Sequence, residues 1–151
     1  MPILHAADFA VQPWKNGGGE TTEIAVFPPA AGFDASDWRV SMAKVAAPGP
    51  FPLFTGIDRT LGLIDGAGLV LDLSGRGEVS MQPGAAPLSF PGDVPVAARL
   101  IDGPILDLNV MTRRGRWRHH LSRVHVSRAA ELDRRGDACL VLFAGSGGNV
   151  G

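Results

Sequence analysis

Hydrophobic and polar residues alternate with a period of two along most of this chain, which is the pattern of half-buried β-strands. The clearest example runs from Trp38 to Ala43, where even-numbered and odd-numbered positions occupy opposite faces. No stretch before residue 128 shows the 3.6-residue period of an amphipathic helix. The alternation predicts strands over residues 7–12, 21–27, 38–43, 57–64, 68–73, 78–82, 97–101 and 105–112.

Turn residues separate these segments every eight to twelve positions, a spacing that favours an all-β barrel or sandwich. Asp65-Gly66 stands between two strand patterns and predicts a β-hairpin. The triplet Gly75-Arg76-Gly77 predicts another turn, and residues 89–93 a tight one. Two later stretches, residues 117–127 and 140–143, also have the character of strands.

Composition agrees with a folded β-protein, since 45% of the 151 residues are hydrophobic and the chain contains Gly 20 and Pro 12. A formal net charge of -1 argues against nucleic-acid binding, and we interpret the basic run 113–120 as a solvated link. The single Cys139 suits a reducing compartment. The N-terminus lacks the pattern of a signal peptide, and no apolar stretch is long enough to span a membrane. We therefore expect a cytoplasmic protein without nucleic-acid or membrane partners.

Residues 13–24, Pro-Trp-Lys-Asn-Gly-Gly-Gly-Glu-Thr-Thr-Glu-Ile, combine three consecutive glycines with groups suited to ligand contact. Trp14 offers a flat amphipathic ring, Lys15 a cation, and Asn16 both donors and acceptors. No Gly-Lys-Ser/Thr follows, so this is not a phosphate-binding P-loop. Local chemistry alone favours a structural turn over a binding loop.

Three stretches together resemble the HutD/Ves family of bacterial cupin-like proteins: residues 13–24, residues 56–61 (Gly-Ile-Asp-Arg-Thr-Leu), and Phe-Pro-Gly-Asp at 90–93 running on to 107–115. The resemblance implies a jelly-roll antiparallel barrel of the bicupin type. On that basis residues 1–112 form a first cupin-like barrel, and residues 113–151 begin a second, incomplete one. It also implies a link to histidine utilisation, which such proteins are thought to restrain by binding an intermediate.

A metal site is not expected, although many enzymatic cupins hold a metal with histidines. None of the four histidines, His5, His119, His120 and His125, lies within residues 58–82, where a His-x-His pair would be expected. Adjacent His119 and His120 point to opposite faces of a strand and cannot share a site. We predict neither a metal nor another cofactor.

The candidate ligand-binding residues follow from strand parity and from the family resemblance, which shifts the glycine loop towards a pocket role. Adjacent Asp58 and Arg59 face opposite sides, and Arg59 suits either a carboxylate ligand or an ion pair with a neighbouring strand. One face of residues 106–112 is polar with a Met in it, as in a small-ligand cavity. Ser41 can face inward, but no His/Asp pattern marks it as a nucleophile. The full set is Trp14, Lys15, Asn16, Gly17, Gly18, Ser41, Asp58, Arg59, Asn109 and Met111.

These observations predict a metal-free protein that binds a small carboxylate metabolite of histidine breakdown, urocanate or a formylated glutamate, with a regulatory outcome. The alternative is a metal-free cupin-type enzyme, an isomerase or hydrolase acting on a similar acid. A pure interaction module would lack an enclosed polar cavity. An open sheet edge at the C-terminus also makes a homodimer plausible.

Overall fold

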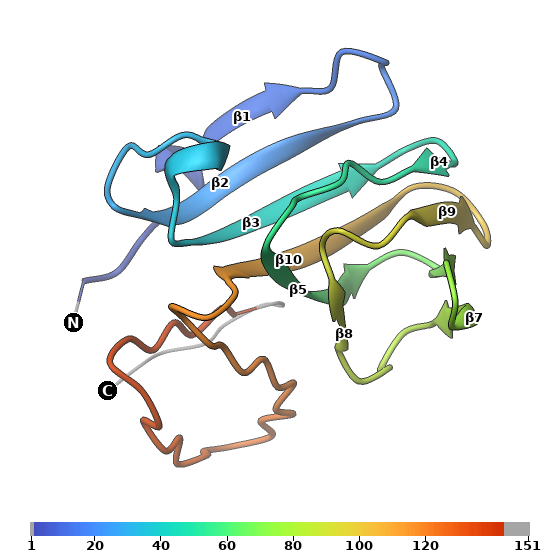
Figure 1. Ribbon diagram of the computed structural model, residues 1–151. Helices are drawn as coiled ribbons and strands as arrows, with labels where there is room; N and C mark the ends of the chain where they lie inside the picture. Colours follow the sequence, from blue (N-terminus) through green and yellow to red (C-terminus); the bar gives the residue numbers. More distant parts are fainter. Residues whose placement is uncertain (1, 144–151) are drawn as a thin grey trace.

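The computed structural model describes residues 2–143 as two antiparallel β-sheets that face each other (Figure 1). The larger sheet contains, in order, β1 (Ala10–Pro13), β2 (Gly19–Phe27), β3 (Trp38–Val45), β10 (Ile105–Arg113), β5 (Ile57–Asp65) and β8 (Leu88–Pro91). The smaller sheet contains β4 (Gly49–Pro50), β9 (Val96–Leu100), β6 (Leu69–Leu73) and β7 (Gly77–Met81). Among these residues the helices are two short 3-10 turns, η1 (Ala6–Asp8) and η2 (Phe33–Ala35), so the all-β prediction is confirmed.

Strand alternation determines which side chains meet between the sheets. Ala43 and Val45 on β3, Leu61 and Leu63 on β5, and Ile105 on β10 all point towards the smaller sheet, and all are buried. The smaller sheet contributes Leu69, Leu71, Leu73, Met81, Val96 and Ala98 to the same apolar cluster. Burial of such side chains contributes roughly 1.5–3 kcal/mol each, so this cluster holds the two layers together.

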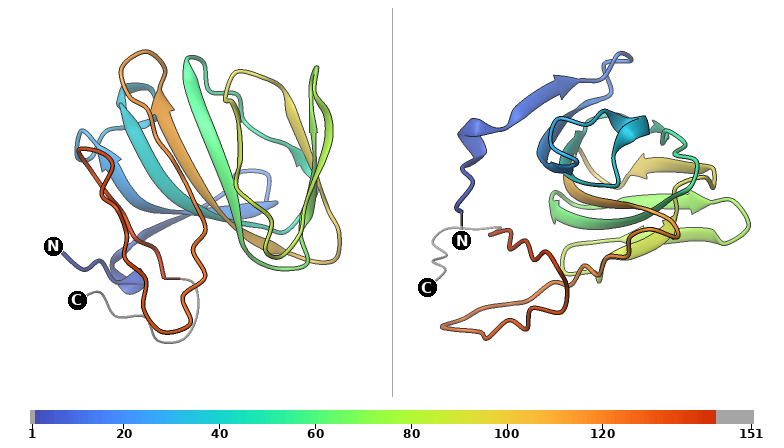
Figure 2. Two further views of the ribbon diagram at one scale, coloured as in Figure 1. Left: turned by 90° about the horizontal axis from the view of Figure 1, so that it is seen from below. Right: turned by 60° about the vertical axis from the view of Figure 1, so that its left-hand side comes forward.

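The predicted barrel is not closed. No hydrogen-bonded strand pair joins the two sheets among residues 2–143, and the layers separate as an open jelly-roll sandwich (Figure 2). The prediction of a β-hairpin at Asp65-Gly66 is also wrong, because the strands on either side of this turn lie in different sheets. β5 pairs with β10 and β8, whereas β6 pairs with β7 and β9, so this turn carries the chain from one sheet to the other. The turn at Gly75-Arg76-Gly77 does join a hairpin, β6 to β7.

The strands expected at residues 117–127 and 140–143 are absent, because residues 117–143 lie along no hydrogen-bonding neighbour. The first part of this segment instead crosses the outer face of the larger sheet, where Trp117 packs on Phe27 with ring centroids 5.6 Å apart. A second barrel beginning at residue 113 and a homodimer stay predictions, and residues 144–151 lie outside the described residues. No helix within residues 2–143 is long and apolar enough to cross a bilayer.

Candidate functional site

The space between the sheets is apolar at one end and polar at the other. The inward-facing residues of β3 are, in order, Arg39, Ser41, Ala43 and Val45, so the character of this face changes along the strand. Register places Arg39 beside Met111 and Met111 beside Arg59, while Ser41 lies beside Asn109. Two arginines therefore lie at the same level on strands β3 and β5, with β10 between them.

Arg59 is 5% exposed and is enclosed mainly by aromatic rings. Its guanidinium carbon lies 5.2 to 5.4 Å from the ring centroids of Phe51, Phe54 and Phe90, as in cation–π contacts. Its Nη2 donates a 2.7 Å hydrogen bond to Asn109 Oδ1. Burial lowers the pKa of Arg59 to about 10, against the opposing effect of the charge on Asp107.

Asn109 connects this guanidinium to a buried acid. The Asn109 amide donates a 2.7 Å hydrogen bond to Asp107 Oδ1. Burial raises the pKa of Asp107 to about 7, although Arg59 and the backbone of Ala43 favour its ionised form. At neutral pH the interior therefore contains an acid close to its titration point, beside a permanent cation.

Arg39 forms the second polar cluster, and this cluster borders a cavity. Its Nη2 lies 2.6 Å from Glu23 Oε2 on β2, and its guanidinium carbon lies 3.8 Å from the centroid of the Phe33 ring. Burial lowers the pKa of Arg39, and the charge of Glu23 opposes the shift. A cavity of about 230 Å³ opens here, lined by Ala10, Gln12, Thr21, Glu23, Ala30, Ala31, Gly32, Phe33 and Arg39.

Both arginines retain unused hydrogen-bonding capacity. The Nε atoms of Arg39 and Arg59 are buried and have no hydrogen-bond partner among residues 2–143. A buried unsatisfied donor costs roughly 1–3 kcal/mol, more when it belongs to a charged group. Of these two arginines, Arg39 lines the larger cavity, so an acceptor on a ligand there would contact its guanidinium group.

The structure brings four of the predicted site residues together. Ser41, Arg59, Asn109 and Met111 share the inward face of three neighbouring strands, which agrees with the expectation from parity. None of them lines the 230 Å³ cavity, from which Arg59 is separated by the stacked rings of Phe33 and Phe54.

The glycine loop lies elsewhere, at the end of β3 remote from Arg39, since Gly19 pairs with Val45. Trp14, Asn16 and Gly18 line a separate cavity of about 120 Å³, whereas Lys15 and Gly17 are exposed and line neither cavity. The Trp14 indole donates to Thr21 Oγ1, and Asn16 Oδ1 accepts from the Gly18 amide. The indole N–H of Trp14 and the side-chain oxygen of Asn16 are thus used within the hairpin, and the pocket role that the resemblance gives these residues stays a prediction.

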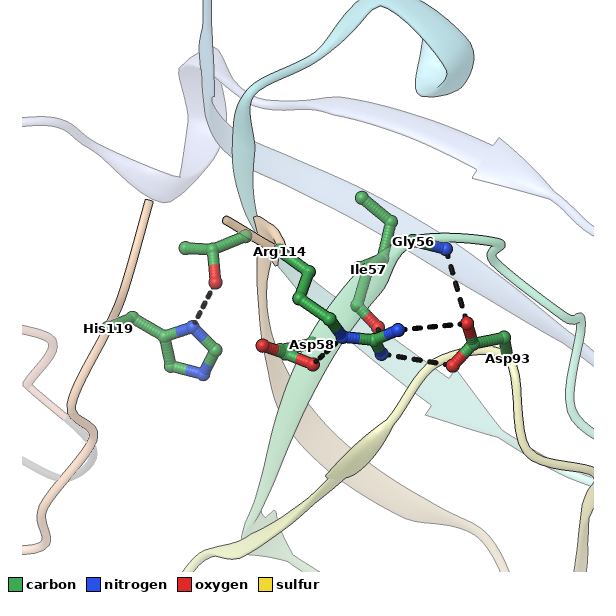
Figure 3. A network of polar contacts seen from close by, with 7 residues as sticks. Gly56, Ile57, Asp58, Asp93, Arg114 and His119 are labelled. Atoms are coloured by element: carbon green, nitrogen blue, oxygen red, sulfur yellow. Dashed lines mark hydrogen bonds and ion pairs between the residues drawn. The ribbon is translucent and has the colours of Figure 1, made fainter. Parts of the chain in front are cut away.

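Asp58 faces away from the interior. The guanidinium of Arg114, which follows β10, lies between Asp58 and Asp93 (Figure 3). Its Nε donates to Asp58 at 2.9 Å, and its two terminal nitrogens donate to Asp93, each at 3.0 Å. These hydrogen bonds lower the pKa of Asp93 to about 2. Asp58 and Asp93 therefore hold β5, β10 and the β8–β9 turn together on the outside of the protein.

Sequence reasoning did not select Arg39, Glu23 and Phe33, three of the residues that line the larger cavity. Arg39 was detectable, because it shares parity with Ser41, which was selected as an inward candidate. Glu23 was not, because a bulge between Glu23 and Ala25 interrupts the alternation of β2. Phe33 belongs to a loop without periodicity.

The residues within 2–143 contain no cluster of three or more His, Cys, Asp or Glu side chains that could hold a metal ion. His119 is engaged instead on the outer face, where its two ring nitrogens contact Thr60 Oγ1 at 2.7 Å and Thr112 Oγ1 at 2.8 Å. The donor set of the cavity, a guanidinium, a carboxylate, an amide and a hydroxyl, suits a polar organic ligand.

Two facing antiparallel sheets with a partly polar interior define a cupin-like protein. The fold is similar to that of a cupin-superfamily sugar phosphate isomerase from Silicibacter pomeroyi, with a TM-score of 0.52 at 21% identity, covering 74% of this chain and 76% of that one. The family comparison goes further, because the HutD family matches residues 6–150. The chain belongs to the HutD family.

Individual relatives agree with this assignment. Protein Ves of Cronobacter sakazakii is 40% identical over 128 residues, which cover 78% of this chain and 64% of that protein. HutD from Pseudomonas fluorescens has a TM-score of 0.65 at 40% identity, covering 71% of this chain and 57% of that one. A conserved protein of unknown function from Pseudomonas aeruginosa has a TM-score of 0.68 at 35% identity, covering 73% and 56%. The chain thus spans less than two thirds of the length of these relatives.

Proposed function

We propose that this protein binds a small carboxylate metabolite in the cavity beside Arg39. The observation that carries the proposal is the guanidinium of Arg39, a mostly buried charged group that lines an open cavity and whose Nε has no hydrogen-bond partner among the described residues. Guanidinium groups bind carboxylates with paired, charge-assisted hydrogen bonds. The side chain is 7% exposed, so such a bond would form largely out of water, where it is stronger.

The remaining cavity wall suits a small planar or extended acid. Phe33 lies flat over the guanidinium and offers an apolar surface, while Gln12 and Thr21 offer neutral donors and acceptors. A volume of about 230 Å³ is adequate for an acid of metabolite size. Membership of the HutD family supports a ligand from histidine degradation, urocanate or a formylated glutamate, with a regulatory outcome.

A metal-free enzyme, an isomerase or hydrolase acting on a similar acid, is the second candidate. Asp107 favours it, because a buried acid whose pKa is raised to about 7 can exchange protons at neutral pH. Asp107 does not line the cavity, however, so binding is better supported. Prolonged incubation with urocanate separates the two: a binding protein leaves its absorbance unchanged, and an enzyme consumes it.

Substitution of Arg39 tests the binding proposal. Arg39→Gln should weaken the binding of urocanate or N-formyl-L-glutamate by roughly tenfold or more in isothermal titration calorimetry, because one charge-assisted contact contributes roughly 1.5–3 kcal/mol. Arg99→Gln is the matched control: Arg99 also pairs with a glutamate, Glu78, at 3.0 Å, but on the surface. Equal affinity in the wild type and Arg39→Gln, or no binding of either acid, would contradict the proposal.

A further inference from the structure

The carboxylate of Glu23 is an unexpected neighbour for an anion-binding site. It belongs to the cavity wall and contacts Arg39, and its side chain is 33% exposed, whereas that of Arg39 is 7% exposed. Glu23 has no other polar partner within residues 2–143. A ligand entering this cavity therefore meets a cation and an anion side by side.

The charges of this pair limit what can bind well. Arg39 and Glu23 together are neutral, and a bare carboxylate placed against the Arg39 guanidinium would lie close to the like charge of Glu23. A ligand that carries an N–H donor close to its carboxylate avoids this repulsion. The ligand carboxylate then contacts Arg39, and the ligand N–H donates a hydrogen bond to Glu23.

We infer that Glu23 is a specificity residue that selects carboxylates with an N–H donor on the neighbouring carbon, as in an α-amino acid or its N-acyl derivative. The inference rests on the proposed carboxylate site at Arg39 and narrows its ligand class. An ammonium group and an amide N–H can both donate a hydrogen bond to Glu23. The binding of an ammonium ligand depends on the negative charge of Glu23, whereas an amide ligand needs only an acceptor oxygen. Gln12 and Thr21, on the same wall, can take up the remaining polar atoms of either ligand.

Three acids with one carbon skeleton test this inference: glutarate without nitrogen, L-glutamate with an ammonium group, and N-formyl-L-glutamate with an amide. In calorimetric titrations of the wild type, at least one nitrogen-bearing acid should bind roughly tenfold or more tightly than glutarate, because it adds a hydrogen bond to a charged acceptor. N-formyl-N-methyl-L-glutamate, which keeps the bulk but lacks the N–H, should bind no better than glutarate.

Variants of Glu23 assign the preference to this side chain. Glu23→Ala should bind L-glutamate and N-formyl-L-glutamate no more tightly than glutarate. Glu23→Gln keeps an acceptor oxygen without the charge, so an amide ligand should retain most of its preference and an ammonium ligand should lose it. Glu20→Gln is the matched control, since Glu20 is exposed on the same strand and lines neither cavity.

Equal binding of glutarate and the nitrogen-bearing acids would overturn this inference and leave the carboxylate site intact. A preference that persists in Glu23→Ala would also overturn it, because another group would then be responsible. Binding of none of these acids, nor of urocanate, would reject the carboxylate site together with the inference. Glu23→Gln preserves side-chain volume, so if Glu23→Ala fails to fold, loss of the preference for L-glutamate over glutarate in Glu23→Gln still tests the inference, and a preference that persists there overturns it.

Discussion

At the scale of single residues, the interior of this protein balances charge against burial. Arg59 stays charged among three phenyl rings because Asn109 accepts one of its hydrogen bonds and Asp107 lies behind that amide. Burial acts on both charges, since it raises the pKa of Asp107 to about 7 and lowers the pKa of Arg59 to about 10. An ionised carboxylate in this position is unfavourable in the folded state compared with water.

Asp107→Asn should change how stability depends on pH. The pKa of Asp107 is about 7 in the folded protein and 3.8 as a model value, so the unfolded chain loses this proton first. The free energy of unfolding should therefore fall as pH rises from about 4 to about 7, by at most about 1.4 kcal/mol per unit of pKa difference.

The side-chain amide introduced at position 107 stays neutral at every pH. The free energy of unfolding of Asp107→Asn should therefore fall less between about pH 4 and about pH 7 than that of the wild type. Urea unfolding at a series of pH values measures the effect, with Asp72→Asn, at an exposed position of β6, as the control. The same decline in the wild type and in Asp107→Asn would show that other groups control the pH dependence.

At the scale of elements, the glycine loop joins β1 to β2 and brings their hairpin against β3. The three glycines serve different purposes. Gly17 has a φ of +73° in the turn, whereas a Cβ at Gly19 would overlap the carbonyl oxygen of Lys44 and press on the Trp14 ring. The backbone oxygen of Gly18 accepts hydrogen bonds from the amides of Ala46 and Ala47. Close approach of two backbones, rather than a ligand, requires glycine at position 19.

Two alanine substitutions should therefore differ in cost. Gly17→Ala meets no atom within 4 Å, so only its backbone conformation is strained, and we expect a loss of about 1–2 kcal/mol. Gly19→Ala must displace β3 or the Trp14 ring and should cost more, with a red-shifted tryptophan emission as the indole becomes exposed. Urea unfolding monitored by fluorescence measures both. Equal losses in the two variants would contradict a backbone contact at Gly19.

At the scale of the whole molecule, the segment after β10 covers the outer face of the larger sheet. Trp117 packs on Phe27, Leu121 lies near Gly62, and Arg123 donates to the carbonyl oxygen of Leu63. His119 is the polar centre of this contact, because its ring joins Thr60 on β5 to Thr112 on β10. Residues 117–143 have no strand partner, so these side-chain contacts hold this part of the segment on the sheet.

His119 should make this contact sensitive to acid. Burial lowers the pKa of His119, so its neutral ring contributes stability above the unfolded value of about 6.5, and this contribution is lost as pH falls. Hydrogen exchange of the Trp117 amide, which donates to the carbonyl oxygen of Arg113, should be faster at pH 5 than at pH 7.5 after correction for intrinsic rates. His119→Ala should exchange fast at both values. His120→Ala, at the exposed neighbouring position, should resemble the wild type. If His120→Ala behaves like His119→Ala, His119 is not the residue that holds this segment on the sheet.

Most strand positions between residues 10 and 113, the scarcity of helix and the inward polar face of β10 were predictable from the sequence, because alternation along a strand is a local property of side-chain direction. The same argument recovered the β6–β7 hairpin and the opposite orientations of Asp58 and Arg59. The family resemblance was also visible in local motifs, and the HutD match bears it out.

Pairing between distant strands was decided only in three dimensions. Asp65-Gly66 has the composition of a hairpin turn, yet β5 and β6 lie in different sheets because each finds a longer-range partner. Arg39 and Glu23 form a cavity wall only after β2 and β3 pair across a bulge and the Phe33 loop closes over them. Local sequence determines which way a side chain points along its own strand, whereas the side chains opposite it depend on contacts between distant segments.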